Sequence, residues 1–242
     1  MAASVPELLA ALEAGELTVL FQPIVDLGTY AVVGAEALWQ WPGADPGWEA
    51  LLDEPAAEPA GRQLVRDALA SVAGWHARSP RIGLTLNATA RQLSAPWWCD
   101  ELTAWLELGN DARAVTVQVS TAEAHARGMG RTMAHLRDAG FRVALDRLGA
   151  DADDLALVHR LPVDAVRLDP SLVSRLDEPS VLASVALLLH ERARLGVEIT
   201  AAGIEDETQR HRLRSLGCRH GQGPLTGRPV SAVALTHAIR HH

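Results

Sequence analysis

The chain has 242 residues, of which 48% are hydrophobic and 21% charged, a composition typical of a globular protein with ample apolar material for a core. Its formal net charge of −8 opposes the phosphate backbone of nucleic acids, and no basic run interleaved with aromatic residues offsets it, so nucleic-acid polymers are excluded as partners. The 22 basic residues are all Arg, which excludes lysine-based catalysis.

The amino terminus gives no sign of a targeting or membrane segment. It lacks a basic region followed by an apolar core, and no apolar run in the chain approaches membrane-spanning length. We therefore expect a cytoplasmic protein that does not insert into membranes.

Eight segments have the composition of β-strands. They are residues 17–25, 31–39, 82–88, 114–120, 141–146, 163–169, 197–203 and, more weakly, 218–221. Helical patterns lie between most of them, most clearly over 178–196, where Glu178 can cap a helix, Pro179 suits its first position and Gly196 can end it. The Pro- and Gly-rich stretch 41–61 reads as a loop that leads into a helix.

After an opening hairpin, strands and helices alternate, which is typical of parallel βαβ units. Eight such strands predict an α/β fold, a TIM-type barrel that forms one domain over residues 1–242, with an open doubly wound sheet as the alternative. In a barrel, functional side chains lie at the carboxyl ends of the strands. The polar or notable residues near those ends are Glu36, Asn87, Gln118, Asp146, Arg167, Asp169 and Ala202.

Glu36 stands inside the apolar run "GAEALWQW". A buried carboxylate is costly unless a cation or hydrogen bonds compensate it, so Glu36 is either part of a functional site or a structural residue.

Five motifs in order resemble the EAL domain family, phosphodiesterases that linearise the bacterial messenger cyclic di-GMP. They are "FQPIVDLGTYAVVGAEALWQW", "LNATARQL", "ALDRLGADADDLALVHRLPVDAVRLDPSLV", "AAGIEDETQRHRLRSLG" and "GQGPLTGRP". The resemblance implies a barrel whose first strand is antiparallel to the others. It also implies two Mg²⁺ or Mn²⁺ ions in active members, held by a carboxylate cluster.

Several positions match the family's site and others depart from it. Glu36, Asn87 and Asp146 match metal ligands, and a second set matches positions that line or brace the pocket, namely Gln22, Asp169, Glu205 and Gln222. Three departures concern the metals: Gln118 stands where a metal-binding Glu is expected, Arg147 replaces a metal-bridging Asp, and Ala202 replaces a Glu that resembles the family's general base or outer ligand. In addition, Arg167 replaces a Lys, and Gln40 replaces a phosphate-binding Arg.

These departures predict a degenerate EAL domain that binds no metal or other cofactor and is catalytically inactive. It would act as a regulatory or protein-interaction module in cyclic di-GMP signalling. We expect Glu36 to pair with Arg147 or Arg167, and Arg147 to point into the barrel mouth beside Asp146 or Glu36. The alternative is a weak phosphodiesterase that uses one metal held by Glu36, Asn87 and Asp146.

The resemblance also bears on the partners. With Gln40 in place of an Arg, cyclic di-GMP should bind weakly or not at all. A protein signalling partner is expected from the regulatory role, and a homodimer is implied by the family loop that matches "DRLGADADDL".

Overall fold

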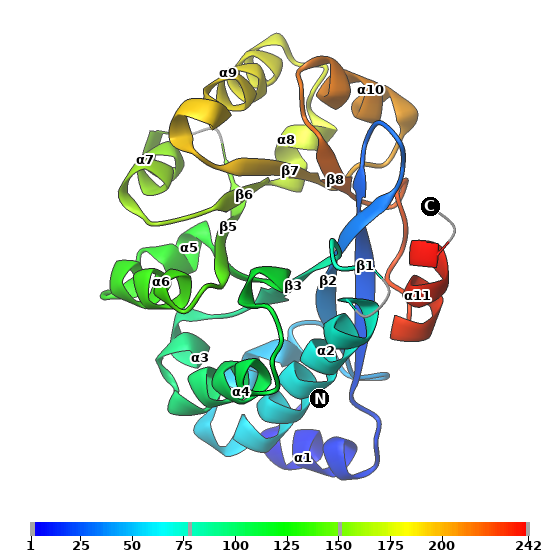
Figure 1. Cartoon of the computed structure of the whole chain (residues 1–242), viewed down its shortest axis with the longest axis vertical. Coiled ribbons are helices and arrows are strands. Elements are labelled where there is room, and N and C mark those ends of the chain that lie inside the picture. Colours follow the sequence, from blue (N-terminus) through cyan, green and yellow to red (C-terminus); the bar gives the residue numbers. More distant parts are fainter. Residues whose placement is uncertain (1–2, 77–78, 150–151, 241–242) are drawn as a thin grey trace.

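Eight strands close into a barrel in chain order (Figure 1). The structure, a computed structural model, describes residues 3–76, 79–149 and 152–240. The strands are β1 (Thr18–Asp26), β2 (Val32–Gln40), β3 (Gly83–Asn87), β4 (Val115–Ser120), β5 (Arg142–Leu148), β6 (Ala165–Leu168), β7 (Glu198–Ala202) and β8 (His220–Gln222). The expected TIM-type barrel is therefore confirmed, and each of the eight predicted segments overlaps a strand.

The first strand runs against the other seven. β1 is antiparallel to β2 on one side and to β8 on the other, whereas the neighbouring pairs from β2 to β8 are parallel. The register of β1 and β2 places Gln22 opposite Glu36. Because β1 and β2 are joined by a short hairpin, they pair as antiparallel neighbours, while parallel strands need a longer crossover.

Helices surround the barrel (Figure 1). They are α1 (Val5–Glu13), α2 (Glu58–His76), α3 (Ala90–Ser94), α4 (Pro96–Glu107), α5 (Thr121–Ala124), α6 (Met129–Asp138), α7 (Ala152–Arg160), α8 (Pro170–Ser174), α9 (Pro179–Leu195), α10 (Glu207–Ser215) and α11 (Ala232–Arg240). In α9, Glu178 is the N-cap residue and Gly196 ends the helix with φ of +70°, a conformation that glycine adopts without steric cost. The described part of the chain has no helix both long and apolar enough to cross a lipid bilayer.

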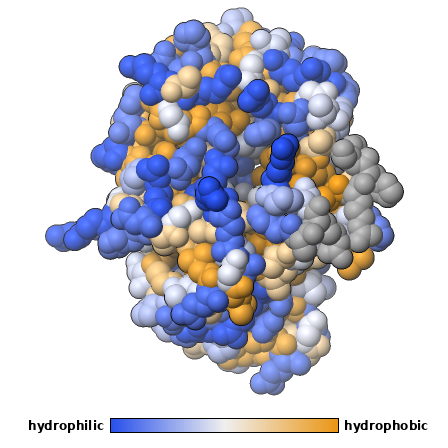
Figure 2. Space-filling model, in the orientation of Figure 1, coloured by the Kyte–Doolittle hydropathy of each residue, from blue (hydrophilic) through white to orange (hydrophobic). Residues whose placement is uncertain are grey.

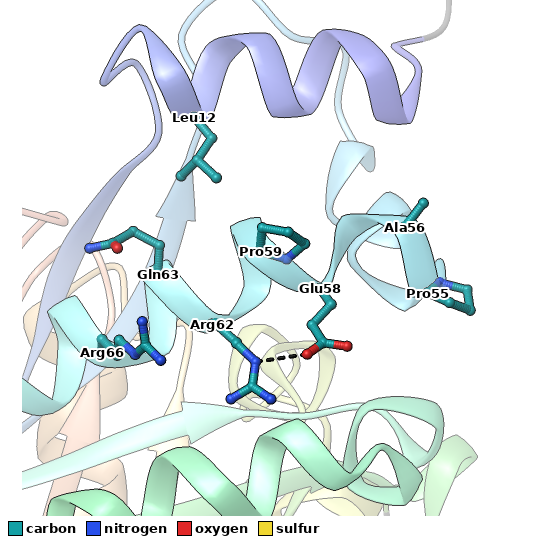
Figure 3. A pocket seen from close by; sticks show the side chains of 8 residues that line it. All are labelled: Leu12, Pro55, Ala56, Glu58, Pro59, Arg62, Gln63 and Arg66. Carbon is teal, nitrogen blue, oxygen red and sulfur yellow. Dashed lines mark hydrogen bonds and ion pairs between the residues drawn. The ribbon is translucent and has the colours of Figure 1, made fainter.

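The main core lies between the strands and the surrounding helices, and includes Trp98, with 1% of its surface exposed. A smaller cluster joins α1 to the start of α2 through Leu8, Trp48 and Leu64. Figure 3 shows the hollow between these two helices, where Arg62 forms an ion pair with Glu58 one helical turn away at 2.8 Å. On the face shown in Figure 2, hydrophilic residues cover much of the surface and gather over the middle of the barrel.

The Pro- and Gly-rich stretch after β2 is compact and not extended. It forms two short 3₁₀ turns, Trp48–Asp53 and Pro55–Ala57, that lead directly into α2. Trp48 is buried and packs edge-on against Trp41 with ring centroids 5.6 Å apart. These contacts hold the first turn against the barrel mouth.

Candidate functional site

A cleft of about 710 Å³ lies at the carboxyl ends of the strands. Because side chains alternate along a strand, residues two apart point to the same side, and the last inward position of each strand faces the barrel mouth. Glu36 on β2, Asn87 on β3, Gln118 on β4, Asp146 on β5 and Arg167 on β6 all line this cleft. The prediction that these strand ends meet at one mouth agrees with this arrangement.

Arg167 occupies the centre of the cluster and binds two carboxylates. Its Nε and Nη2 donate to the two oxygens of Asp146 at 2.6 and 2.9 Å, a bidentate pairing that the planar guanidinium geometry favours. Its Nη1 donates to Oε2 of Glu36 at 2.5 Å and to Oε1 of Gln222 at 3.2 Å. One fixed cation thus neutralises acids on two different strands.

Amide side chains complete the hydrogen bonding of Glu36. Asn87 Nδ2 donates to Glu36 Oε1 at 2.7 Å, and Gln222 Nε2 donates to Glu36 Oε2 at 2.7 Å. Gln118 Nε2 in turn donates to Asn87 Oδ1 at 2.9 Å, which fixes the orientation of the Asn87 amide. Glu36, Gln118 and Gln222 are each buried, and none of the described residues has a buried side-chain polar atom without a hydrogen-bond partner.

Ionisation in the cluster follows from this geometry. Burial alone would raise the pKa of Glu36, but the charge and hydrogen bonds of Arg167, with those of Asn87 and Gln222, hold the pKa below its ordinary value of 4.5. Burial opposes the charged form of Arg167, yet Asp146 and Glu36 raise its pKa above the ordinary value. Glu36 is therefore held as a carboxylate beside the charged guanidinium of Arg167.

Arg147 lines the cleft, but within the described residues it makes no ion pair with Glu36 or Asp146, so the expectation that its guanidinium compensates these acids is wrong. It is exposed at the rim of the cleft, and within the described residues its guanidinium makes no ion pair. Its backbone has φ of +56°, a left-handed conformation that is uncommon for residues other than glycine, and its N–H donates to Asp146 Oδ1 at 2.7 Å. Arg167, one strand away, takes the internal position instead, because its side chain points into the barrel from the regular part of β6.

The remaining predicted residues lie around the cluster with different roles. Gln22 accepts a hydrogen bond from Gln222 at 2.8 Å and braces the same network. Asp169 caps α8 by accepting from the Ser171 N–H, Glu205 is exposed beyond β7, and Ala202 is buried at the end of β7. None of these last three lines the cleft.

The three residues that match family metal ligands have their oxygens committed to protein donors. Asn87 Oδ1 accepts from Gln118, Glu36 accepts from Asn87, Gln222 and Arg167, and Asp146 accepts from Arg167 and its neighbour's N–H. Across the described ranges, no group of three or more His, Cys, Asp or Glu side chains is arranged to hold a metal ion. A divalent cation does not fit this ligand set, because Arg167 already supplies the positive charge between the acids.

Sequence reasoning missed three acidic residues of the cleft, Glu49, Asp53 and Glu123. Asp53 accepts a hydrogen bond from the Thr89 hydroxyl at 2.7 Å, and Glu123 accepts from the Ala90 N–H at 2.8 Å. A signal existed for Glu123, since it follows Ser120 by three residues and that spacing marks a helix start, as observed in α5. No comparable pattern marks Glu49 or Asp53.

The fold and the cluster define a class: a (β/α)8 barrel with a reversed first strand and a polar site at the carboxyl ends of its strands. The profile of the EAL domain family matches residues 6–229. The chain therefore belongs to the EAL domain family.

Its relatives include cyclic di-GMP phosphodiesterases. The cyclic di-GMP phosphodiesterase PA2567 of Pseudomonas aeruginosa is 26% identical over 232 residues, covering 91% of this chain and 40% of that protein. The probable cyclic di-GMP phosphodiesterase PdeB of Escherichia coli is 25% identical, covering 89% of this chain and 43% of that protein. The chain thus spans about two fifths of the length of these two relatives.

Solved structures support the same fold. The EAL enzyme Bd1971, in its cAMP- and cyclic-di-GMP-bound form, superimposes with a TM-score of 0.88 at 20% identity, covering 98% of this chain and 68% of that one. The EAL domain of Mycobacterium smegmatis DcpA superimposes with a TM-score of 0.78 at 25% identity, covering 93% and 98%.

Proposed function

We propose that this EAL domain does not hydrolyse cyclic di-GMP and acts as a regulatory, protein-interaction module in cyclic di-GMP signalling. The observation that carries the proposal is the internal Arg167, which is bound to Glu36 and Asp146 in the place where metal chemistry requires free carboxylate oxygens. Phosphodiester hydrolysis by this family depends on divalent cations that activate water and stabilise the developing charge. Without a ligand set for them, the main catalytic contribution is lost.

The charge of the cleft supports an interaction role over nucleotide sensing. Five carboxylates and two guanidinium groups line it, which gives a formal charge of −3. A cyclic dinucleotide carries two phosphate charges and would meet net repulsion there. Gln40, at the position of the family's phosphate-binding Arg, is instead an acceptor for the Thr18 hydroxyl at 3.3 Å.

The test is turnover of cyclic di-GMP by the purified protein in Mg²⁺ and in Mn²⁺, followed by chromatography of the linear product. We expect no hydrolysis above a protein-free control. Metal-dependent turnover would contradict the proposal and would favour a weak phosphodiesterase that uses Glu36, Asn87 and Asp146. The same preparation should be titrated with cyclic di-GMP by calorimetry, with and without metal. A submicromolar dissociation constant for cyclic di-GMP without metal would contradict the proposed interaction module and would favour a nucleotide sensor.

A further inference from the structure

The amino end of the barrel contains a second cavity, of about 230 Å³. The inward positions at the starts of the strands are small, with Gly34 on β2, Ala144 on β5 and Ala165 on β6. Barrel interiors are ordinarily filled by layers of bulky branched side chains, so this layer is underfilled. The space could hold roughly seven water molecules at about 30 Å³ each, or one small molecule.

Hydroxyl groups without protein partners face this cavity. Thr85 on β3, Thr116 on β4 and Thr200 on β7 line it, and no described protein group bonds to their hydroxyls. Thr85 is 9% exposed, and because the described residues contain no buried side-chain oxygen or nitrogen without a hydrogen-bond partner, its hydroxyl is open to the space of the cavity. The three hydroxyls are therefore available to bond a molecule in the cavity, as donors or as acceptors.

Positive charge surrounds the same cavity. Three guanidinium groups, those of Arg81, Arg142 and Arg167, and one carboxylate, that of Glu198, line it. Because the charge of Arg167 is already counted with the acids of the cleft, the formal charge left here is +1, from Arg81 and Arg142 against Glu198. Arg142 is paired with Glu198 at 2.7 Å, and Arg167 with the acids of the opposite mouth. Arg81 lies at the exposed rim, and its guanidinium has no ion pair within the described residues. The two ends of the barrel therefore differ in sign.

We propose that the amino end of the barrel is a second binding site, which takes a small oxyanion of the phosphate or carboxylate kind. Arg81 and Arg142 supply the charge, and the hydroxyls of Thr116 and Thr200 donate to the anion's oxygens. The site is separated from the carboxyl-end cleft by one layer, since Gln118 and Arg167 line both spaces. The proposal is independent of whether the cleft binds a nucleotide or a protein.

The experiment is a titration of the ¹⁵N-labelled chain with inorganic phosphate at constant ionic strength, followed by amide chemical shifts. We expect saturable shifts at the starts of β3, β4 and β7, where Gly83, Thr116 and Glu198 lie. Arg81→Gln should weaken binding about tenfold or more, which corresponds to about 1.4 kcal/mol. Thr116→Val and Thr200→Val keep the side-chain shape and remove the hydroxyls, so they should also weaken it.

Arg147→Gln is the matched control, because it removes an exposed, unpaired guanidinium from the opposite end of the barrel and should leave phosphate binding unchanged. Each variant's spectrum reports whether it keeps the wild-type fold. Shifts that are scattered and do not saturate, or saturable binding that Arg81→Gln leaves intact, would overturn the proposal. So would shifts confined to the carboxyl-end cleft. These readouts do not depend on hydrolysis or on cyclic di-GMP. The failure of this proposal can therefore be distinguished from the failure of the proposed function.

Discussion

The central residue of the carboxyl-end cleft is Arg167, whose side chain is 14% exposed and joins two acidic side chains. Breaking a buried ion pair on one side leaves the other charges uncompensated, at a cost of about 3–5 kcal/mol. We therefore expect Arg167→Met to lower the free energy of unfolding by about that amount, as measured by urea denaturation.

Arg147→Gln provides the comparison for that measurement, since it removes the same charge from an exposed position. Exposed substitutions of this kind change stability by about 0.5 kcal/mol or less. Equal losses in the two variants would contradict the structural role given to Arg167.

Ionisation of Glu36 predicts a pH dependence. Its pKa is lowered in the folded state, so its stabilising contribution is present above the ordinary value of 4.5 and is lost as pH falls through the lower, folded-state value. The free energy of unfolding of the wild-type chain should fall more steeply below pH 4.5 than that of Glu36→Gln. Parallel pH profiles in the two proteins would show that Glu36 is not held as a carboxylate by its neighbours.

At the residue scale, sequence reasoning identified the positions of the cleft but misplaced one contact. The placement of Glu36, Asn87, Gln118 and Asp146 at or near the carboxyl ends of predicted barrel strands was sufficient to bring them together. It could not give the direction of Arg147, because that depends on a left-handed backbone angle at the strand end, which no residue type there signals. Pairing of Glu36 with Arg167 was one of two alternatives left open, and the regular geometry of β6 decides between them.

At the scale of elements, α2 is held to α4 by a buried acid. Glu101 on α4 is 4% exposed and accepts from Arg62 at 2.6 Å and from Arg66 at 2.6 and 2.8 Å. Burial alone would raise the pKa of Glu101, but the two guanidinium groups lower it. Both arginines come from α2, so one carboxylate fixes the relative rotation of the two helices.

Close packing between the same helices gives a matched pair of substitutions. A Cβ on Gly61 in α2 would lie 2.9 Å from Trp97 Cη2 in α4, so Gly61→Ala should destabilise the protein by about 1–3 kcal/mol through overpacking. A Cβ on Gly74, in the same helix, would meet no atom within 4 Å, and Gly74→Ala should stabilise by about 0.5–1 kcal/mol. Thermal unfolding of the two variants tests this prediction. A higher melting temperature in both variants would show that α4 can shift away from α2 at no cost in stability.

Elements with strong periodicity were predictable, whereas short ones in irregular stretches were not. The capping residues of α9 marked both of its ends. The turns Trp48–Asp53 and Pro55–Ala57 lie in a stretch whose composition predicts only a loop. 3₁₀ turns are too short to show a helical period and are fixed by packing, here of Trp48. The loop of the expected homodimer contact includes residues 150 and 151, which lie outside the described residues, so the dimer stays a prediction.

At the scale of the whole molecule, the carboxyl-end site is assembled from most of the strands of the barrel, so activity should not return through one substitution. Arg147→Asp alone adds an acid at an exposed rim without freeing the oxygens of Glu36 or Asp146. We expect measurable hydrolysis of cyclic di-GMP only when Gln118→Glu, Arg147→Asp, Ala202→Glu and Arg167→Lys are combined, with Gln40→Arg for the phosphate. Activity in Arg147→Asp alone would contradict the view that Arg167 blocks the metal site.

The reversed first strand has a consequence for the order of folding. β1 and β2 are neighbours along the chain and share eight register pairs, whereas β1 meets β8 through only two, Val25 with Gly221 and Asp26 with His220. Pairing of β1 with β2 closes a short loop, whereas pairing of β1 with β8 closes a loop of nearly 200 residues, from Val25 to Gly221. Closing the longer loop costs more conformational entropy, and fewer paired residues offset that cost. The hairpin should therefore form early and the β1–β8 seam last. In native-state hydrogen exchange, the amides of Leu27 and Gly221 at the seam should open well below the free energy of global unfolding, while those in the middle of β2 open only with the whole barrel.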